Sequence, residues 1–160
     1  MITIEINDAL ISAALASAIS QLGDMTNVME QVALTMRDQT KDRFGEHQAP
    51  DGTPWAARSA ATLAAYDRRA KKVGGLGAWG GILRYGGQLS GNIASASGPD
   101  FAEVTSPEPY AAMMQFGGTK AAFPHLWGDI PARPFFGLSD ENETDILDTI
   151  SEALAAALAH

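Results

Sequence analysis

The first stretch whose residues could support chemistry contains three closely spaced glycines. Gly75, Gly77 and Gly80 have the spacing of the glycines that approach a pyrophosphate in dinucleotide-binding folds. In those folds the glycines follow a buried strand and open a helix whose amino terminus holds the phosphates. Here RRAKKVG precedes the glycines and GILRYGG follows them, so neither required element flanks them. We therefore predict no cofactor site in this stretch.

A second stretch places two carboxylates near each other. Asp100 and Glu103 resemble the acid pair that holds Mg²⁺ in metal-dependent nucleases, where a lysine polarises the attacking water. The spacing between the two acids is too short, and Thr105 stands where the lysine is required. We interpret the pair as exposed acids of a hairpin.

Histidine, cysteine and serine provide no further candidates for catalysis. His47, His125 and His160 are scattered and form no pair at ligand spacing on a helix. The chain has no cysteine, which excludes thiol nucleophiles and Cys-ligated zinc, and no serine lies in a nucleophile elbow. We predict no catalytic residue, no metal and no cofactor, and nothing in these residues proposes a reaction; an enzyme would need a metal or cofactor bound in the purified protein.

Charge is distributed unevenly along the chain. The formal net charge is -8, which argues against general binding of nucleic acid. Residues 37–84 contain nine basic and five acidic residues, a net of +4, which leaves -12 for the remainder. Four of the basic residues form a cluster, Arg68, Arg69, Lys71 and Lys72. The uneven charge is interpreted either as a solvated helix end or as two regions that attract each other, within the chain or between neighbouring copies. For the cluster itself, a contact to nucleic acid is a further alternative.

The length and composition predict a single domain over residues 1–160. With 46% hydrophobic residues, a chain of 160 residues can bury a core. Glu5 and Asp8 stand where a secretory signal would carry basic residues, and the apolar tract from Ala9 to Leu22 is too short to cross a bilayer. We expect a soluble protein that does not enter a membrane.

The elements that must position any functional residues begin with a strand and two helices. Residues 2–6 alternate in the manner of a half-buried strand. Asn7 or Asp8 is expected to cap a helix that ends at Gly23, and Asp24 or Thr26 to open a second helix. The far end of that second helix is filled by polar residues, namely Arg37, Asp38, Lys41, Asp42 and Arg43.

The middle of the chain is rich in turns. Residues 45–58 predict a turn-rich connection anchored by Trp55, and residues 59–72 a short helix. The sequence 73–87 predicts a long Gly-rich loop because glycine disfavours helix. Two strands are predicted next, Gln88 to Ser97 and Phe101 to Ser106, joined by a hairpin turn.

The last third predicts two more helices around an extended segment. A short helix is expected from Glu108 to Phe116. Two prolines require the segment from Ile130 to Phe136 to be extended, and we expect it at an edge. Ser139 is expected to cap an amphipathic carboxyl-terminal helix whose stripe comprises Ile146, Ile150, Leu154 and Leu158.

Four segments together resemble the phage virion morphogenesis family, the tail-completion proteins of Mu-like contractile-tailed phages. They are DGTPWAARSAATL (51–63), GGILRYGGQLSGNI (80–93), PYAAMMQFGG (109–118) and IPARPFFGLSDENETDI (130–146). The resemblance implies an α+β fold, with helices packed on a small antiparallel sheet. It also implies a structural part of the virion near the junction of head and tail, without catalysis. The chain departs from the family at Tyr85-Gly86-Gly87 and at Met114, where the family often has histidine.

The resemblance and the sequence together predict assembly into a ring of identical subunits, hexameric by resemblance to tail-end and neck components. We expect contacts to tail tube, sheath or connector proteins, with nucleic acid as the alternative partner. The predicted interface residues are Arg133, Phe135, Phe136, Trp79 and the basic cluster. Phe135 also fits a core position, because aromatic side chains serve both cores and interfaces. The substitution Arg133→Glu is predicted to leave folding intact and to block assembly.

Overall fold

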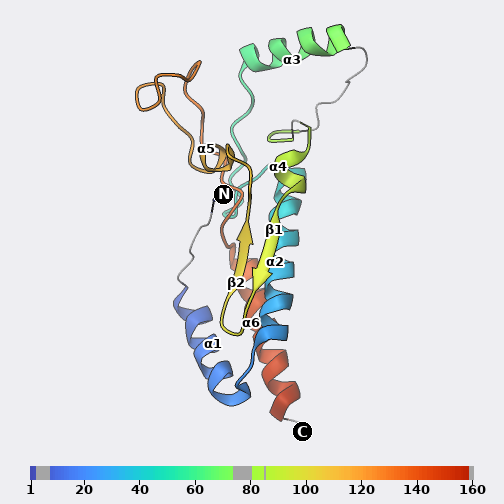
Figure 1. Ribbon diagram of the computed structural model, residues 1–160, viewed down its shortest axis with the longest axis vertical. Helices are drawn as coiled ribbons and strands as arrows, with labels where there is room; N and C mark the ends of the chain where they lie inside the picture. The colour runs from blue at the N-terminus through green and yellow to red at the C-terminus, as the bar shows by residue number, and fades with distance from the viewer. Residues whose placement is uncertain (3–7, 74–80, 85, 159–160) are drawn as a thin grey trace.

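The computed structural model of the chain describes residues 1–2, 8–73, 81–84 and 86–158 (Figure 1). The fold is α+β, as predicted: helices pack around one small antiparallel sheet of two strands. The described helices and strands are α1 (Ala9–Leu22), α2 (Thr26–Glu46), α3 (Ala60–Val73), α4 (Gln88–Gly91), β1 (Ala94–Ser97), β2 (Ala102–Thr105), α5 (Ala111–Phe116) and α6 (Asp140–Leu158).

Helix α1 has the capping residues that the sequence predicted. A carboxylate oxygen of Asp8 accepts hydrogen bonds from the amides of Leu10 and Ile11 at 2.8 and 3.0 Å, which satisfies amides that lack partners within the helix. The helix ends at Gly23, whose amide donates to the carbonyl of Ile19. Both ends of α1 are therefore confirmed.

Helix α2 begins as predicted and extends slightly further. The carboxylate of Asp24 accepts hydrogen bonds from the amide and hydroxyl of Thr26 at 2.9 and 2.7 Å, which lowers the pKa of Asp24. The helix continues past Gly45 to Glu46 and ends at His47, which has a left-handed φ of 60°. Arg43, in its last turns, is buried because its guanidinium finds acceptors in the chain that leads into α6.

Helix α6 packs along α1 and α2. The hydroxyl of Ser139 accepts from the amide of Asn142 at 3.1 Å, so the predicted cap is confirmed. Ile146 and Ile150 are buried in one of two core clusters, together with Ala18, Met25, Met29 and Val32. Ile146, Ile150 and Leu154 of the predicted stripe are thus covered within the chain.

The hairpin of β1 and β2 lies against α2, as Figure 1 shows. Ala94 pairs with Thr105 and Ser97 with Ala102, and the amide of Gly98 donates to the carbonyl of Phe101 at 2.9 Å. The first strand of this hairpin was predicted to begin at Gln88, but Gln88–Gly91 is the short helix α4. Gly87, at φ 74°, turns the chain into α4, and Leu89 is buried from this helical position.

The strand predicted for residues 2–6 is described only at its first position. Ile2 is buried and forms an isolated antiparallel bridge with Ser106, whose carbonyl accepts from the Ile2 amide at 3.1 Å. Residues 3–7 lie outside the described residues, and so does most of the Gly-rich loop predicted for 73–87.

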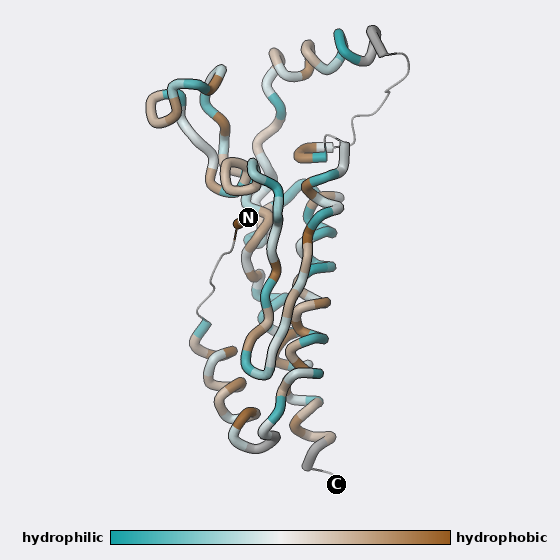
Figure 2. Tube along the Cα trace, viewed as in Figure 1, coloured by the Kyte–Doolittle hydropathy of each residue, from teal (hydrophilic) through white to brown (hydrophobic). Residues whose placement is uncertain are grey.

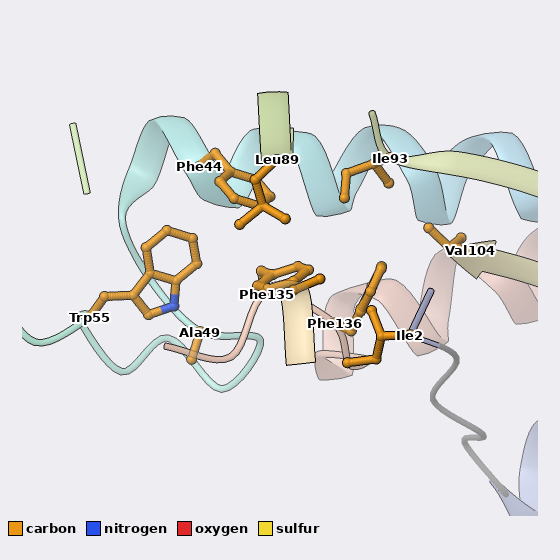
Figure 3. Packing of buried hydrophobic residues seen from close by; sticks show 10 residues of the cluster. Ile2, Phe44, Ala49, Trp55, Leu89, Ile93, Val104, Phe135 and Phe136 are labelled. Carbon is orange, nitrogen blue, oxygen red and sulfur yellow. The ribbon is translucent and has the colours of Figure 1, made fainter. Parts of the chain in front are cut away.

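The segment 130–136 enters the core only in its second half, because Pro131 and Ala132 are exposed. It is extended, as its prolines require, but Phe135 and Phe136 are both buried. Figure 3 shows Phe135 between Phe44 and Phe136, with Trp55 near Phe44. The edge prediction rested on the prolines, which lack amide donors. It was wrong because the core encloses the two adjacent phenylalanines.

Candidate assembly surface

The segment 133–136 is held in the core by side chains from distant parts of the sequence. The Gln115 side-chain oxygen accepts hydrogen bonds from the amides of Phe135 and Phe136, both at 3.0 Å, and its nitrogen donates to the carbonyl of Phe136. The Trp55 indole nitrogen donates to the carbonyl of Pro134 at 2.7 Å, which confirms Trp55 as an anchor. Backbone that lacks sheet partners is thus satisfied by side chains.

Arg43 connects the end of α2 to the beginning of α6. One guanidinium nitrogen donates to the carbonyls of Phe135 and Gly137 at 2.8 and 2.9 Å, and the other donates to the side-chain oxygen of Asn142. Burial lowers the pKa of Arg43, while the charge of Glu46 acts in the opposite direction. Sequence reasoning assigned this arginine to a polar helix end, since periodicity alone does not reveal distant acceptors.

Arg133 was predicted to contact a neighbouring subunit, but the structure gives it a role inside the chain. Its side chain is only 8% exposed. The guanidinium donates to the carbonyls of Ala56 and Ala57 at 2.8 and 3.1 Å, which joins the extended segment to the connection that follows Trp55. Burial, together with the nearby charge of Arg58, lowers the pKa of Arg133. We reassign Arg133 to the stabilisation of the fold.

The other predicted interface residues fall into three groups. Phe135 and Phe136 belong to the core, which leaves their rings almost no surface for a neighbour. Trp79 lies outside the described residues. Of the basic cluster, Arg68 and Arg69 are exposed on α3, and the side chains of Lys71 and Lys72 lie outside the part described. Among the predicted interface residues that the structure describes, Arg68 and Arg69 are exposed and Arg133, Phe135 and Phe136 are buried, so these form no single exposed site.

A different exposed surface was missed by the sequence analysis. We define the aromatic loop as residues 119–129, which project from the body next to α5 (Figure 1). Trp127 is fully exposed, Phe123 is 40% exposed, and Phe116 at the end of α5 is 66% exposed. Figure 2 shows hydrophobic positions on this projecting loop, away from the packed helices. The only signal in the sequence was the aromatic content of this stretch, which does not distinguish a buried loop from an exposed one.

The base of the aromatic loop is closed by hydrogen bonds. Gly118 and Ile130 exchange two backbone hydrogen bonds, at 2.9 and 2.7 Å, and the carboxylate of Asp129 accepts from the amide of Lys120 at 2.7 Å. Gly117, at φ 71°, turns the chain into the loop, and a Cβ at this position would lie 2.6 Å from the Ala132 nitrogen. These contacts fix where the loop leaves the body.

The tip of the loop has turns of its own. The carbonyl of Thr119 accepts from the amides of Ala122 and Phe123 at 3.1 and 2.9 Å, and the carbonyl of Phe123 accepts from the amide of Leu126 at 3.0 Å. The Phe123 ring contacts the His125 ring edge-on, with centroids 6.2 Å apart. The loop therefore presents its aromatic side chains on a locally ordered backbone.

A cleft of about 470 Å³ lies between the beginning of α3, α4 and the base of the aromatic loop. Apolar side chains line much of it, including Ile82, Leu89 and Met114. The Arg58 guanidinium lies 5.0 Å from the centre of the Tyr66 ring at its rim. Such a lining has the character of a site for apolar or aromatic groups.

The residues that the structure describes include neither a group of metal ligands nor a membrane-spanning helix. Within these residues, no group of three histidine, aspartate or glutamate side chains is arranged to hold a metal ion. No helix in the same part of the chain is both long enough and apolar enough to cross a membrane.

The model of the phage virion morphogenesis family matches residues 6–155, and the chain belongs to this family. It is therefore a phage structural or assembly protein, and the resemblance seen in the sequence is confirmed.

The relatives come from Mu and a Mu-like prophage. The chain is 31% identical over 160 residues to the putative capsid assembly protein G of Escherichia phage Mu, with 98% of each chain covered. It is 38% identical over 88 residues to the Mu-like prophage FluMu G protein 2 of Haemophilus influenzae, covering 51% of this chain and 62% of that protein. No solved structure matches the chain significantly.

Proposed function

We propose that this protein acts in tail completion, tail termination or head–tail joining, as a non-enzymatic ring of identical subunits at the neck or tail end of the virion. Its partners in this proposal are its own copies and tail tube, sheath or connector proteins. The family and its Mu relative support a role in assembly, and the aromatic loop provides a surface for it.

The observation that carries the proposal is the exposure of Trp127. A tryptophan contributes little to stability when it contacts only water, whereas aromatic side chains supply much of the binding energy of protein interfaces. Phe123 on the same loop and Phe116 at the end of α5 are also exposed, and the loop has a fixed base. A subunit or partner that covers the loop would bury these three rings without reorganising the body, which lowers the cost of association.

Replacing Trp127 with serine tests the proposal. Because the side chain is fully exposed, we expect the free energy of unfolding to change by less than about 0.5 kcal/mol. We expect the variant to assemble at least about tenfold more weakly. Native mass spectrometry over a concentration series measures the assembly, and urea unfolding measures the stability.

Leu10→Ser is the matched control, since Leu10 is 63% exposed on α1 and lies outside the aromatic loop. It is expected to assemble like the wild type. The proposal is contradicted if Trp127→Ser assembles like the wild type and a phage carrying it yields normal numbers of infectious particles.

A further inference from the structure

Helix α3 stands apart from the rest of the chain. Among the described elements, none packs extensively against this helix of 14 residues, which lies at one end of the molecule in Figure 1. Only its first half, with Thr62 and Tyr66, borders the cleft. An isolated helix of this length is marginal in water. We therefore expect a further surface to support α3.

The outward face of α3 is basic. Residues 60–73 include four basic residues and one acidic residue, Asp67. Tyr66 lines the cleft, and Arg68 follows two positions later, roughly 200° further around the helix. Arg68 therefore lies on the side away from the cleft, whereas Arg69 is turned back toward the cleft side. Both are exposed, and we define the basic face of α3 by these two arginines. A surface that supports this face of α3 must carry negative charge.

Helix α6 has such a surface. We define the acidic stripe as the four exposed carboxylates that recur at separations of four, three and four residues, Glu141, Asp145, Asp148 and Glu152. Helical periodicity places this stripe opposite Ile146 and Ile150, which face the core. No basic residue occurs between 140 and 158.

The position of these acids distinguishes the stripe from ordinary helix capping. Carboxylates in the first turn of a helix are favoured by the positive end of the helix dipole, which accounts for Glu141. That effect is lost beyond the first turn, so it does not account for Asp148 and Glu152. Asp145 accepts from the neutral side chain of Gln39 at 2.7 Å, which leaves its charge uncompensated by that contact.

We propose that α3 of one copy docks through its basic face on the acidic stripe of α6 in a neighbouring copy. This inference rests on the proposed assembly of identical subunits and names the surfaces that meet. In Figure 1, α3 and the carboxyl-terminal half of α6 lie at opposite ends of the elongated molecule, so the contact joins different copies. A contact between two different surfaces is head-to-tail and closes into a ring when the rotation between copies permits.

Nucleic acid would also attract the basic face of α3, but the rest of the molecule disfavours it. The sequence outside residues 37–84 carries a net charge of -12, which repels phosphates and attracts the basic helix of another copy. Because the contact depends on exposed charges, assembly is expected to weaken as the salt concentration rises.

Exchange of charges between the two surfaces tests the inference. The helix variant is Arg68→Glu with Arg69→Glu, and the stripe variant is Asp148→Arg with Glu152→Arg. Each is expected to raise the dissociation constant of the oligomer by at least about tenfold, because like charges then face each other. The variant with all four substitutions is expected to return to within about threefold of the wild type, because opposite charges face each other again.

The control makes the same change of charge as the stripe variant, at residues outside the stripe. Glu30→Arg with Asp100→Arg alters exposed positions of α2 and of the hairpin turn and is expected to assemble like the wild type. Analytical ultracentrifugation gives the dissociation constants, and circular dichroism verifies that every variant is folded.

Each outcome has a defined meaning. Failure of the fourfold variant to recover, or normal assembly of the helix variant, overturns the inference and leaves the proposed ring intact. A monomeric wild type overturns both. If the helix variant assembles normally but loses salt-sensitive binding of a duplex DNA fragment, α3 contacts nucleic acid and the docking inference is rejected.

Discussion

Replacing Phe135 with alanine is expected to lower the free energy of unfolding by about 3–5 kcal/mol. The Phe135 side chain is 0% exposed. Its ring centre lies 5.3 Å from that of Phe44 and 4.7 Å from that of Phe136, so truncation removes contacts on two sides and leaves a cavity. The amides of Phe135 and Phe136 donate to the Gln115 side-chain oxygen, which holds the backbone in place and restricts collapse around the cavity.

Urea unfolding followed by tryptophan fluorescence measures this loss, since Trp55 lies in the same core cluster. Phe116→Ala is the control, because Phe116 is 66% exposed and its truncation is expected to cost less than about 0.5 kcal/mol. A Phe135→Ala variant that unfolds like the wild type but fails to assemble would return Phe135 to an interface.

Replacing Arg133 with glutamate is expected to lower the free energy of unfolding by about 2–4 kcal/mol. The substitution removes the donors to the carbonyls of Ala56 and Ala57 and places a carboxylate beside these two acceptors. A buried charge without a donor is strongly disfavoured. This expectation replaces the earlier one that the variant would fold normally.

Arg133→Lys separates geometry from charge. Lysine keeps the positive charge but not the planar group that reaches both carbonyls, so we expect a loss smaller than that of the glutamate variant. Equilibrium unfolding of the two variants and the wild type gives the comparison. If Arg133→Glu retains wild-type stability and abolishes assembly, the arginine acts at an interface after all.

Helix ends could be predicted from the sequence because capping is local. Asp8 and Ser139 each satisfy amides two or three residues ahead, and Gly23 ends α1 by its own conformation. The hairpin turn at 98–100 was predicted for the same reason. No distant residue has to be known for these features.

The core and the exposed surfaces depend on partners far away in the sequence. Arg43 and Arg133 look like surface residues in the sequence because their backbone acceptors are distant. Arg43 donates to Phe135, 92 positions away, and Arg133 donates to Ala56, 77 positions away. The two phenylalanines of the extended segment are buried for a related reason, since Gln115 supplies the hydrogen bonds their amides need. Trp127 illustrates the converse, because nothing in its local sequence indicates full exposure.

The uneven distribution of charge could be counted from the sequence, and the structure adds where the exposed charges lie in the molecule. The net charge of +4 in residues 37–84 includes Arg43, which is buried, and the exposed Arg68 and Arg69 of α3. The acidic stripe of α6 lies toward the other end of the molecule. Copies arranged head to tail would therefore bring opposite charges together.

Native mass spectrometry of the purified wild-type protein, combined with negative-stain imaging of the same sample, tests the central claim most directly. We expect a single closed assembly with a fixed number of subunits, six by resemblance to neck and tail-end components, which is seen as a ring. A sharply monomeric mass at micromolar concentration, unchanged when tail or connector proteins are added, would contradict it.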